Sequence, residues 1–309
     1  WSSFEMRIQG LEARGDGVEP EKVPRMFRRI CHDLSLAQYR MYGSRICDRL
    51  NELSVRGYRL IHRSKGGFGE GAIRFILDTF PNALRREWKL FVVSSLAFWL
   101  PFFLIWWSAH HEIAWVQALL GAEGMRSIEG MYGKDADTVE FLRAEHGSNF
   151  MMFGMYIWNN VGIDFRLFAS GILWGIGTLF FLIFNGLHIG AVVGYVDYAG
   201  DPEKLWTFVA GHSSFELLGM VVVGMAGLKM GFALLAPGDY SRAQALSRAG
   251  RQGLPLLVGG TLLTVLAAVV EGFWSAQPVG KEIKYTVGIV FWVLHILYFV
   301  FVGRRFRGA

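Results

Sequence analysis

Four stretches of the sequence contain no Asp, Glu, Lys or Arg and consist mainly of apolar residues. They are Leu90–Trp107, Leu167–Phe184, Leu254–Val270 and Thr286–Gly303, each of 17 or 18 residues. A helix of about this length crosses the hydrocarbon core of a bilayer. A soluble protein does not repeat such stretches four times, and apolar residues make up 52% of this chain. The sequence therefore predicts an all-α fold, a polytopic membrane helix bundle.

The distribution of charge predicts how the bundle is oriented. Residues 1–89 hold 17 Lys and Arg against 11 Asp and Glu, whereas residues 108–165 hold 3 against 8. The short link 236–253 and the tail 304–309 are also rich in Arg. Because positively charged segments stay on the cytoplasmic side, we expect arm, link, tail and both termini in the cytoplasm and the 108–165 loop outside.

We expect three regions along the chain. Residues 1–88 form a cytoplasmic helical arm and an interfacial elbow helix, residues 89–303 form the membrane domain, and 304–309 form a basic tail. The arm contains no short apolar core of a secretory signal peptide. Its apolar residues recur at helical spacing on both sides of Gly43, which predicts a helical hairpin rather than a nucleic-acid-binding surface. These residues are Met26, Ile30, Leu34, Ile46, Leu50 and Leu53.

The elbow helix is predicted from an apolar stripe that precedes the first span. Its members are Ile73, Ile76, Leu77, Phe80, Leu84 and Trp88. Arg and Lys occupy the other positions, which is typical of a helix lying in the membrane interface, with Pro81 as a kink.

The inferred sides of the membrane require region 166–235 to cross an odd number of times. Three crossings would place turns near Asn185-Gly186 and near Asp197–Lys204. The alternative is one crossing and a re-entrant element around 185–215. We favour about six embedded segments in total, of which one or two can be interrupted or re-entrant.

Polar residues within the apolar segments mark candidate functional positions, because charge in hydrocarbon is costly. An intramembrane polar cluster is predicted from His212, Glu216, Glu271 and Lys229. The first two are four residues apart and share a helix face, whereas Lys229 follows Glu216 on nearly the opposite face. This cluster has three alternative roles: a structural polar clamp, a proton or cation site, or a metal site. We favour the clamp and assign no metal ligands. Asn159, Asn160 and Asn185 are predicted to form a polar break or mouth.

Known catalytic and cofactor-binding motifs are missing from the sequence. It has no GxSxG elbow, P-loop, HExxH or CxxC motif, so we expect neither an enzyme nor a cofactor. The two cysteines, Cys31 and Cys47, lie in the arm without a metal-type spacing and are predicted to be reduced thiols.

Several short motifs resemble the stage II sporulation protein M family of bacterial multi-pass membrane proteins. They include Asn159-Asn160-Val161, Phe168–Ile172, Gly175–Thr178, Asn185-Gly186, His212 with Glu216, Ala226–Gly231, Pro237-Gly238, Arg242, Ala245-Leu246 and Glu271–Phe273. The arm resembles the helical domain that precedes the spans in the long, non-sporulating form of that family, and the segment Arg56–His62 carries this likeness. The resemblance implies the family's membrane core and an interaction role, whereas the arm and the acidic loop speak against a role in sporulation.

Two hypotheses follow. The first is a non-enzymatic scaffold in the bacterial cytoplasmic (inner) membrane that forms a homodimer and binds other membrane or envelope proteins, but no nucleic acid. The second is a transporter or channel for a small solute or cation that uses the intramembrane His/Glu cluster.

Overall fold

The computed structural model describes residues 5, 23–61 and 68–304, and most of them are helical. No β-strand occurs in this described part of the chain, which confirms the predicted all-α class. The chain divides into two compact units, residues 1–71 and 72–309. His62 and the tail beyond Arg304 lie outside the described residues.

The first unit contains a helical hairpin. Helix α2 (Val23–Tyr39) packs against α3 (Ser44–Ile61) through a small apolar core. The fully buried members of this core are Ile30, Ala37, Leu50 and Leu53. The chain reverses just before Gly43, where Met41 adopts a left-handed φ of 52°. Helical spacing therefore located the hairpin correctly, although Ile46 is exposed rather than buried.

Within the described residues, five helices are long and apolar enough to cross a membrane. They are α6 (Trp88–Ala109), α11 (Ile176–Ala199), α13 (Ser213–Leu235), α14 (Arg242–Val270, extended by the π-helix η4, Glu271–Ser275) and α15 (Lys281–Phe301). Helix α13 is the centre of the unit, because most of its residues are buried and it contacts α14, α6, α10 and α15. Helices α6 and α15 expose mainly apolar side chains, as lipid-facing helices do.

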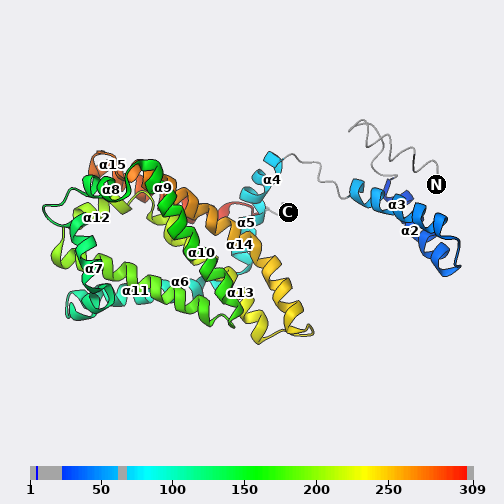
Figure 1. The fold of residues 1–309 in the computed structure, drawn as a ribbon, viewed down its shortest axis with the longest axis horizontal. Coiled ribbons are helices and arrows are strands. Elements are labelled where there is room, and N and C mark those ends of the chain that lie inside the picture. Colours follow the sequence, from blue (N-terminus) through cyan, green and yellow to red (C-terminus); the bar gives the residue numbers. More distant parts are fainter. Residues whose placement is uncertain (1–4, 6–22, 62–67, 305–309) are drawn as a thin grey trace, which may run out of the picture. The chain divides into compact units, whose positions relative to one another are not determined.

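A sixth embedded segment runs from Asn149 to Ile172 as an almost continuous helical stretch. It comprises α9 (Asn149–Tyr156), the π-helix η2 (Ile157–Val161), α10 (Gly162–Ala169) and the 3-10 turn η3 (Ser170–Ile172). The segment packs along α14 and α13, and Figure 1 shows it beside α14 for most of its length. The expectation that residues 149–165 form an outer loop is therefore wrong. Asp164, Asn159 and Asn160 made this helix look too polar to span.

The remaining helices gather at the two ends of the bundle. At one end lie α7 (Ala114–Tyr132), α8 (Thr138–His146) and α12 (Pro202–Val209), which form the loop end. At the other lie α5 (Phe80–Arg86) and the link between α13 and α14, which form the elbow end. Figure 1 shows α11 and α14 running between these ends.

The turn predicted at Asn185-Gly186 is wrong, because both residues lie in the middle of α11. The reversal comes earlier, at Leu173–Gly175, where Trp174 and Gly175 have φ of 52° and 80°. The second predicted turn is correct, since α11 ends at Ala199 and α12 begins at Pro202. Helix α11 is continuous, so no re-entrant element interrupts it.

Glycine lets α11 approach α6 closely. A Cβ at Gly186 would overlap the carbonyl oxygen of Phe98, and one at Gly190 would overlap that of Phe102. Helix packing in lipid depends on such close backbone contact, because apolar burial alone gives little driving force there. These glycines therefore hold the bundle together from within.

The elbow consists of α4 (Phe68–Arg74), the π-helix η1 (Phe75–Thr79) and α5. Phe80 and Leu84 are buried against the bundle, whereas Ile73, Ile76 and Leu77 are exposed. Arg85 Nη1 donates a hydrogen bond to the Phe299 carbonyl oxygen at 2.9 Å, which attaches α5 to α15. The exposed apolar face agrees with an interfacial helix.

Candidate functional site

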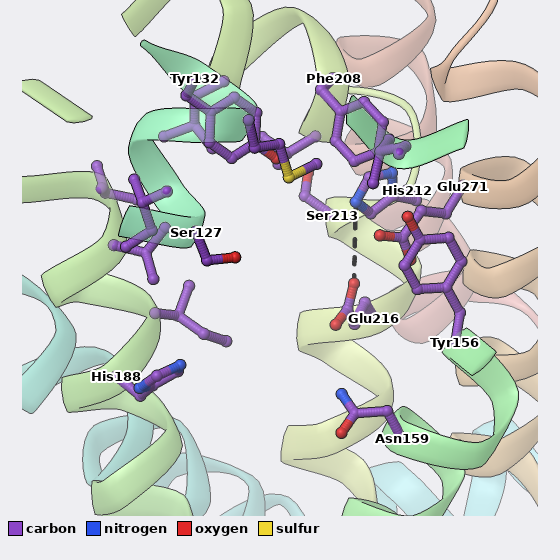
Figure 2. Close-up of a pocket in the computed structure, with 18 of the residues that line it drawn as sticks. Ser127, Tyr132, Tyr156, Asn159, His188, Phe208, His212, Ser213, Glu216 and Glu271 are labelled. Carbon is purple, nitrogen blue, oxygen red and sulfur yellow. Dashed lines mark ion pairs between the residues drawn. The ribbon is translucent and has the colours of Figure 1, made fainter. Parts of the chain in front are cut away.

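A cavity of about 530 Å³ lies within the bundle near its loop end. Its walls come from α7, α8, α9, α11, α12 and α13, and most of them are apolar. The exposed side chains of Ser127 and Glu145 line its rim. Polar groups converge on one side, where His212, Glu216 and Glu271 face the cavity (Figure 2).

The sequence brings these three side chains together from two helices. His212 precedes α13, Glu216 lies in its first turn, and Glu271 begins η4 at the end of α14. His212 Nε2 is 3.9 Å from Glu216 Oε2, which is too long for a hydrogen bond. One nitrogen or oxygen atom from each of the three residues lies within 4.8 Å of the others. Such an imidazole and two carboxylates can hold a metal ion or another cation.

A serine on η4 fixes the orientation of the histidine. His212 Nδ1 is 2.9 Å from Ser275 Oγ, and both residues are almost fully buried. Lys284 Nζ donates to the Ser275 carbonyl oxygen at 2.7 Å and so anchors the same turn from α15. When Nδ1–H donates to the serine oxygen, Nε2 presents its lone pair toward Glu216.

Two polar atoms beside the cluster have no hydrogen-bond partner other than each other. They are Glu271 Oε2 and the hydroxyl of Tyr156, both buried. Figure 2 shows the Tyr156 ring next to Glu271. An unsatisfied buried polar group costs about 1–3 kcal/mol, and more when it is charged. The cluster is therefore incomplete within the described protein atoms.

The opposite wall of the cavity carries a phenol that stays neutral. Tyr132, the last residue of α7, is buried among Phe208, Leu142 and other apolar side chains. Burial raises the pKa of the Tyr132 phenol well above its usual range, and the nearby carboxylates add to this effect. Tyr132 can donate a hydrogen bond to a bound molecule at any physiological pH.

Lys229 lies apart from the cluster with which the sequence grouped it. It follows Glu216 by 13 residues, which at 1.5 Å per residue is about 20 Å along α13. Its Nζ is instead 2.6 Å from Glu87 Oε1, at the junction of α5 and α6. This ion pair connects α13 to the elbow end of the bundle, far from the cavity, and its position indicates a structural role.

The three asparagines of the predicted polar mouth have different positions. Asn159 lines the cavity and donates from Nδ2 to Asn160 Oδ1 at 2.9 Å, and both lie in η2. Asn185 does not line the cavity, because its Nδ2 donates to the Phe181 carbonyl oxygen within α11. Asn159 and Asn160 therefore lie together in η2, and Asn185 lies apart from them in α11.

Comparison with known proteins identifies the membrane core. The model of the family "Stage II sporulation protein M" matches residues 94–276, more than half of the chain. The chain belongs to this family. A domain of unknown function (DUF8413) matches residues 1–63 of this family member. The match to the core covers α11, α13 and α14, and with them every residue of the polar cluster.

One curated relative of this family member is the uncharacterized protein MJ0793 of Methanocaldococcus jannaschii. The two are 30% identical over 115 residues, which is 37% of this chain and 65% of the relative. No solved structure matches the chain.

Several site residues of this family member escaped sequence analysis. Tyr156 and Ser275 belong to apolar or small-residue segments and carry no distinguishing pattern. Both lie next to or within π-helices, η2 and η4, and π-turns often occur at functional sites. A π-turn adds one residue to a helical turn without a sequence signature, so periodicity could not reveal it.

Proposed function

We propose that this membrane protein binds a small cationic solute in the cavity and carries it across the membrane. The observation that carries the proposal is the convergence of His212, Glu216 and Glu271 on one side of a cavity inside the bundle. Ionisable residues within transmembrane segments are costly and usually serve a task, and Glu216 and Glu271 lie in the spans α13 and α14–η4 near their loop ends. Two carboxylates favour a cation over an anion.

The bundle is closed between this cavity and the elbow end. Beyond Glu216, α13 packs against α6 and α11 through fully buried side chains, among them Phe98, Leu182 and Met225. Transport therefore requires this apolar layer to separate, as in carriers that expose one site alternately to each side.

Flux into proteoliposomes tests the proposal. The purified full chain should transport at least one of the probes Na⁺, Zn²⁺ and methylammonium faster than protein-free vesicles do. Glu216→Gln should lower that flux at least tenfold. Glu145→Gln, at the exposed rim of the same cavity, should leave it unchanged. Equal flux in empty vesicles for all three probes would overturn the transport function.

We also propose residence in a bacterial cytoplasmic (inner) membrane with both termini in the cytoplasm. Arg242, Arg248 and Arg251 lie in the first part of α14, near the elbow end. The acidic α7–α8 region lies at the opposite end. The positive-inside rule assigns the elbow end to the cytoplasm.

A non-enzymatic scaffold is the second candidate, supported by the separate N-terminal unit. The α2–α3 hairpin has its own core, and its reversal exposes Tyr39, Met41 and Tyr42. Exposed aromatic and methionine side chains favour protein contacts, with a second copy or with envelope proteins. Deletion of residues 1–66 should remove co-purifying partners without lowering the unfolding temperature of the membrane unit. An unchanged set of partners would contradict the scaffold.

A further inference from the structure

We infer that His212, Glu216 and Glu271 bind a divalent transition-metal ion at the polar side of the cavity. This inference deepens the proposed function, because it names the ligand of the same cluster. Metal binding is measured separately from transport, so the metal site and the transport function can be refuted independently.

The distances between the donor atoms favour one ion shared by all three residues. Two ligands of a first-row ion, each bound at roughly 2.0–2.2 Å, lie roughly 3–4 Å from each other. His212 Nε2 and Glu216 Oε2 are 3.9 Å apart, and no donor pair in the cluster exceeds 4.8 Å. A direct hydrogen bond would require a shorter contact. The His212–Glu216 spacing therefore agrees with an ion between the two side chains better than with contact between them, and the other donor pairs, all within 4.8 Å, lie close enough to join after small side-chain shifts.

The surroundings of the histidine favour a metal over an organic ammonium group. Ser275 Oγ can accept the Nδ1 proton of His212 at 2.9 Å and leave the Nε2 lone pair free. Metal-bound histidines commonly have such a partner on the second nitrogen. An ammonium group would need acceptors only, and the carboxylates alone would provide them.

Charge balance supplies an independent observation. Glu271 is about nine-tenths buried, and its Oε2 has no hydrogen-bond donor other than the Tyr156 hydroxyl. In the part of the chain that the structure describes, no Lys or Arg forms an ion pair with Glu216 or Glu271. The nearby Lys284 uses its Nζ on the Ser275 carbonyl oxygen. Glu271 is buried and Glu216 is partly buried, with 20% of its side chain exposed toward the cavity. Two such carboxylates without a cationic partner are costly, and a divalent ion would balance both.

The mixed donor set indicates the class of ion. Imidazole suits Zn²⁺, Fe²⁺ and similar ions, whereas Mg²⁺ and Ca²⁺ prefer oxygen ligands alone. Three protein ligands would leave a coordination position for a further ligand, and all three residues line the cavity. The Tyr156 side chain lies next to Glu271 (Figure 2).

Metal binding by the purified full chain tests the inference. Equilibrium dialysis against micromolar Zn²⁺ or Mn²⁺ should give one ion per chain above the background of a metal-free detergent control. His212→Ala and Glu271→Gln should weaken this binding at least tenfold. His188→Ala is the matched control, because His188 lines the same cavity outside the cluster, and it should bind like wild type.

Size-exclusion profiles and unfolding temperatures without metal show which variants are folded. If His212→Ala fails to fold, Co²⁺ added to the wild type provides a second readout. Co²⁺ should produce visible absorption bands typical of a nitrogen- and oxygen-ligated four- or five-coordinate ion. Subsequent addition of Zn²⁺ should remove these bands. Absence of metal in wild type, or equal binding in His212→Ala, overturns the site, and a shared proton then explains the carboxylates. A chain that binds Zn²⁺ but shows no flux retains the site and loses the transport function.

Discussion

Lys229 Nζ lies 2.6 Å from Glu87 Oε1 and joins the central helix α13 to the residue between α5 and α6. Both side chains are mostly buried, with 14% and 18% of their surfaces exposed. Removing one partner of a buried ion pair leaves an unpaired charge, which costs about 3–5 kcal/mol when burial is complete. This pair holds the elbow against the bundle.

Lys229→Met should lower the stability of the membrane unit by about 1–3 kcal/mol, below that range because Arg86 Nε remains 3.3 Å from Glu87 Oε1 and some solvent reaches the pair. Glu87→Gln should cost less, since an amide can still accept from Lys229. The double variant should be more stable than the sum of both changes predicts. Thermal unfolding in detergent measures all three, and strictly additive losses would contradict the pairing.

Replacing a packing glycine in α11 should separate two spans. Gly186→Ala places a methyl group on the Phe98 carbonyl oxygen, so we expect a loss of about 1–3 kcal/mol, as for overpacking elsewhere. Gly154→Ala, in α9, is the matched control because a Cβ there meets nothing within 4 Å. It should be neutral or slightly stabilising through helix propensity. Equal unfolding temperatures for the two variants would refute the close α6–α11 contact.

The sequence predicted most of the fold because length and hydropathy decide which helices cross a bilayer. The segment that contains Asn159, Asn160 and Asp164 escaped this criterion. Two of its polar residues, Asn160 and Asp164, are buried against other helices, whereas Asn159 and Arg166 are exposed. Hydropathy averages over both faces of a helix, so a span that is polar on one side resembles a loop.

The candidate site was predicted in part, for a related reason. His212 and Glu216 share a helix face, and their spacing of four residues is visible in the sequence. That Glu271 joins them, and Lys229 does not, depends on how α13 and α14 pack. Asn185-Gly186 resembled a turn because Asn-Gly favours reversals. In α11 the glycine is required for contact with α6, and the Asn185 side chain bonds within its own helix.

The two native cysteines allow a direct test of orientation. Cys31 and Cys47 lie in the N-terminal unit, and the chain has no others. A membrane-impermeant maleimide should label them in intact cells only after the membrane is permeabilised. In a cysteine-free background, Asp135→Cys, between α7 and α8, should be labelled without permeabilisation, because Asp135 is exposed at the loop end. The reverse pattern would place the N-terminal unit outside the cell.

The hydrogen bond between Ser275 and His212 provides a final prediction, which separates a metal site from a structural polar clamp. Ser275→Ala removes the group that orients the imidazole but retains all three ligands. Loss of such a partner typically weakens metal binding 10- to 100-fold, so we expect Zn²⁺ affinity to fall by about that factor. Ser214→Ala is the matched control, because Ser214 Oγ is equally buried but has no hydrogen-bond partner. A clamp without metal would show a lower unfolding temperature for Ser275→Ala in metal-free buffer and no difference in Zn²⁺ binding between the two variants.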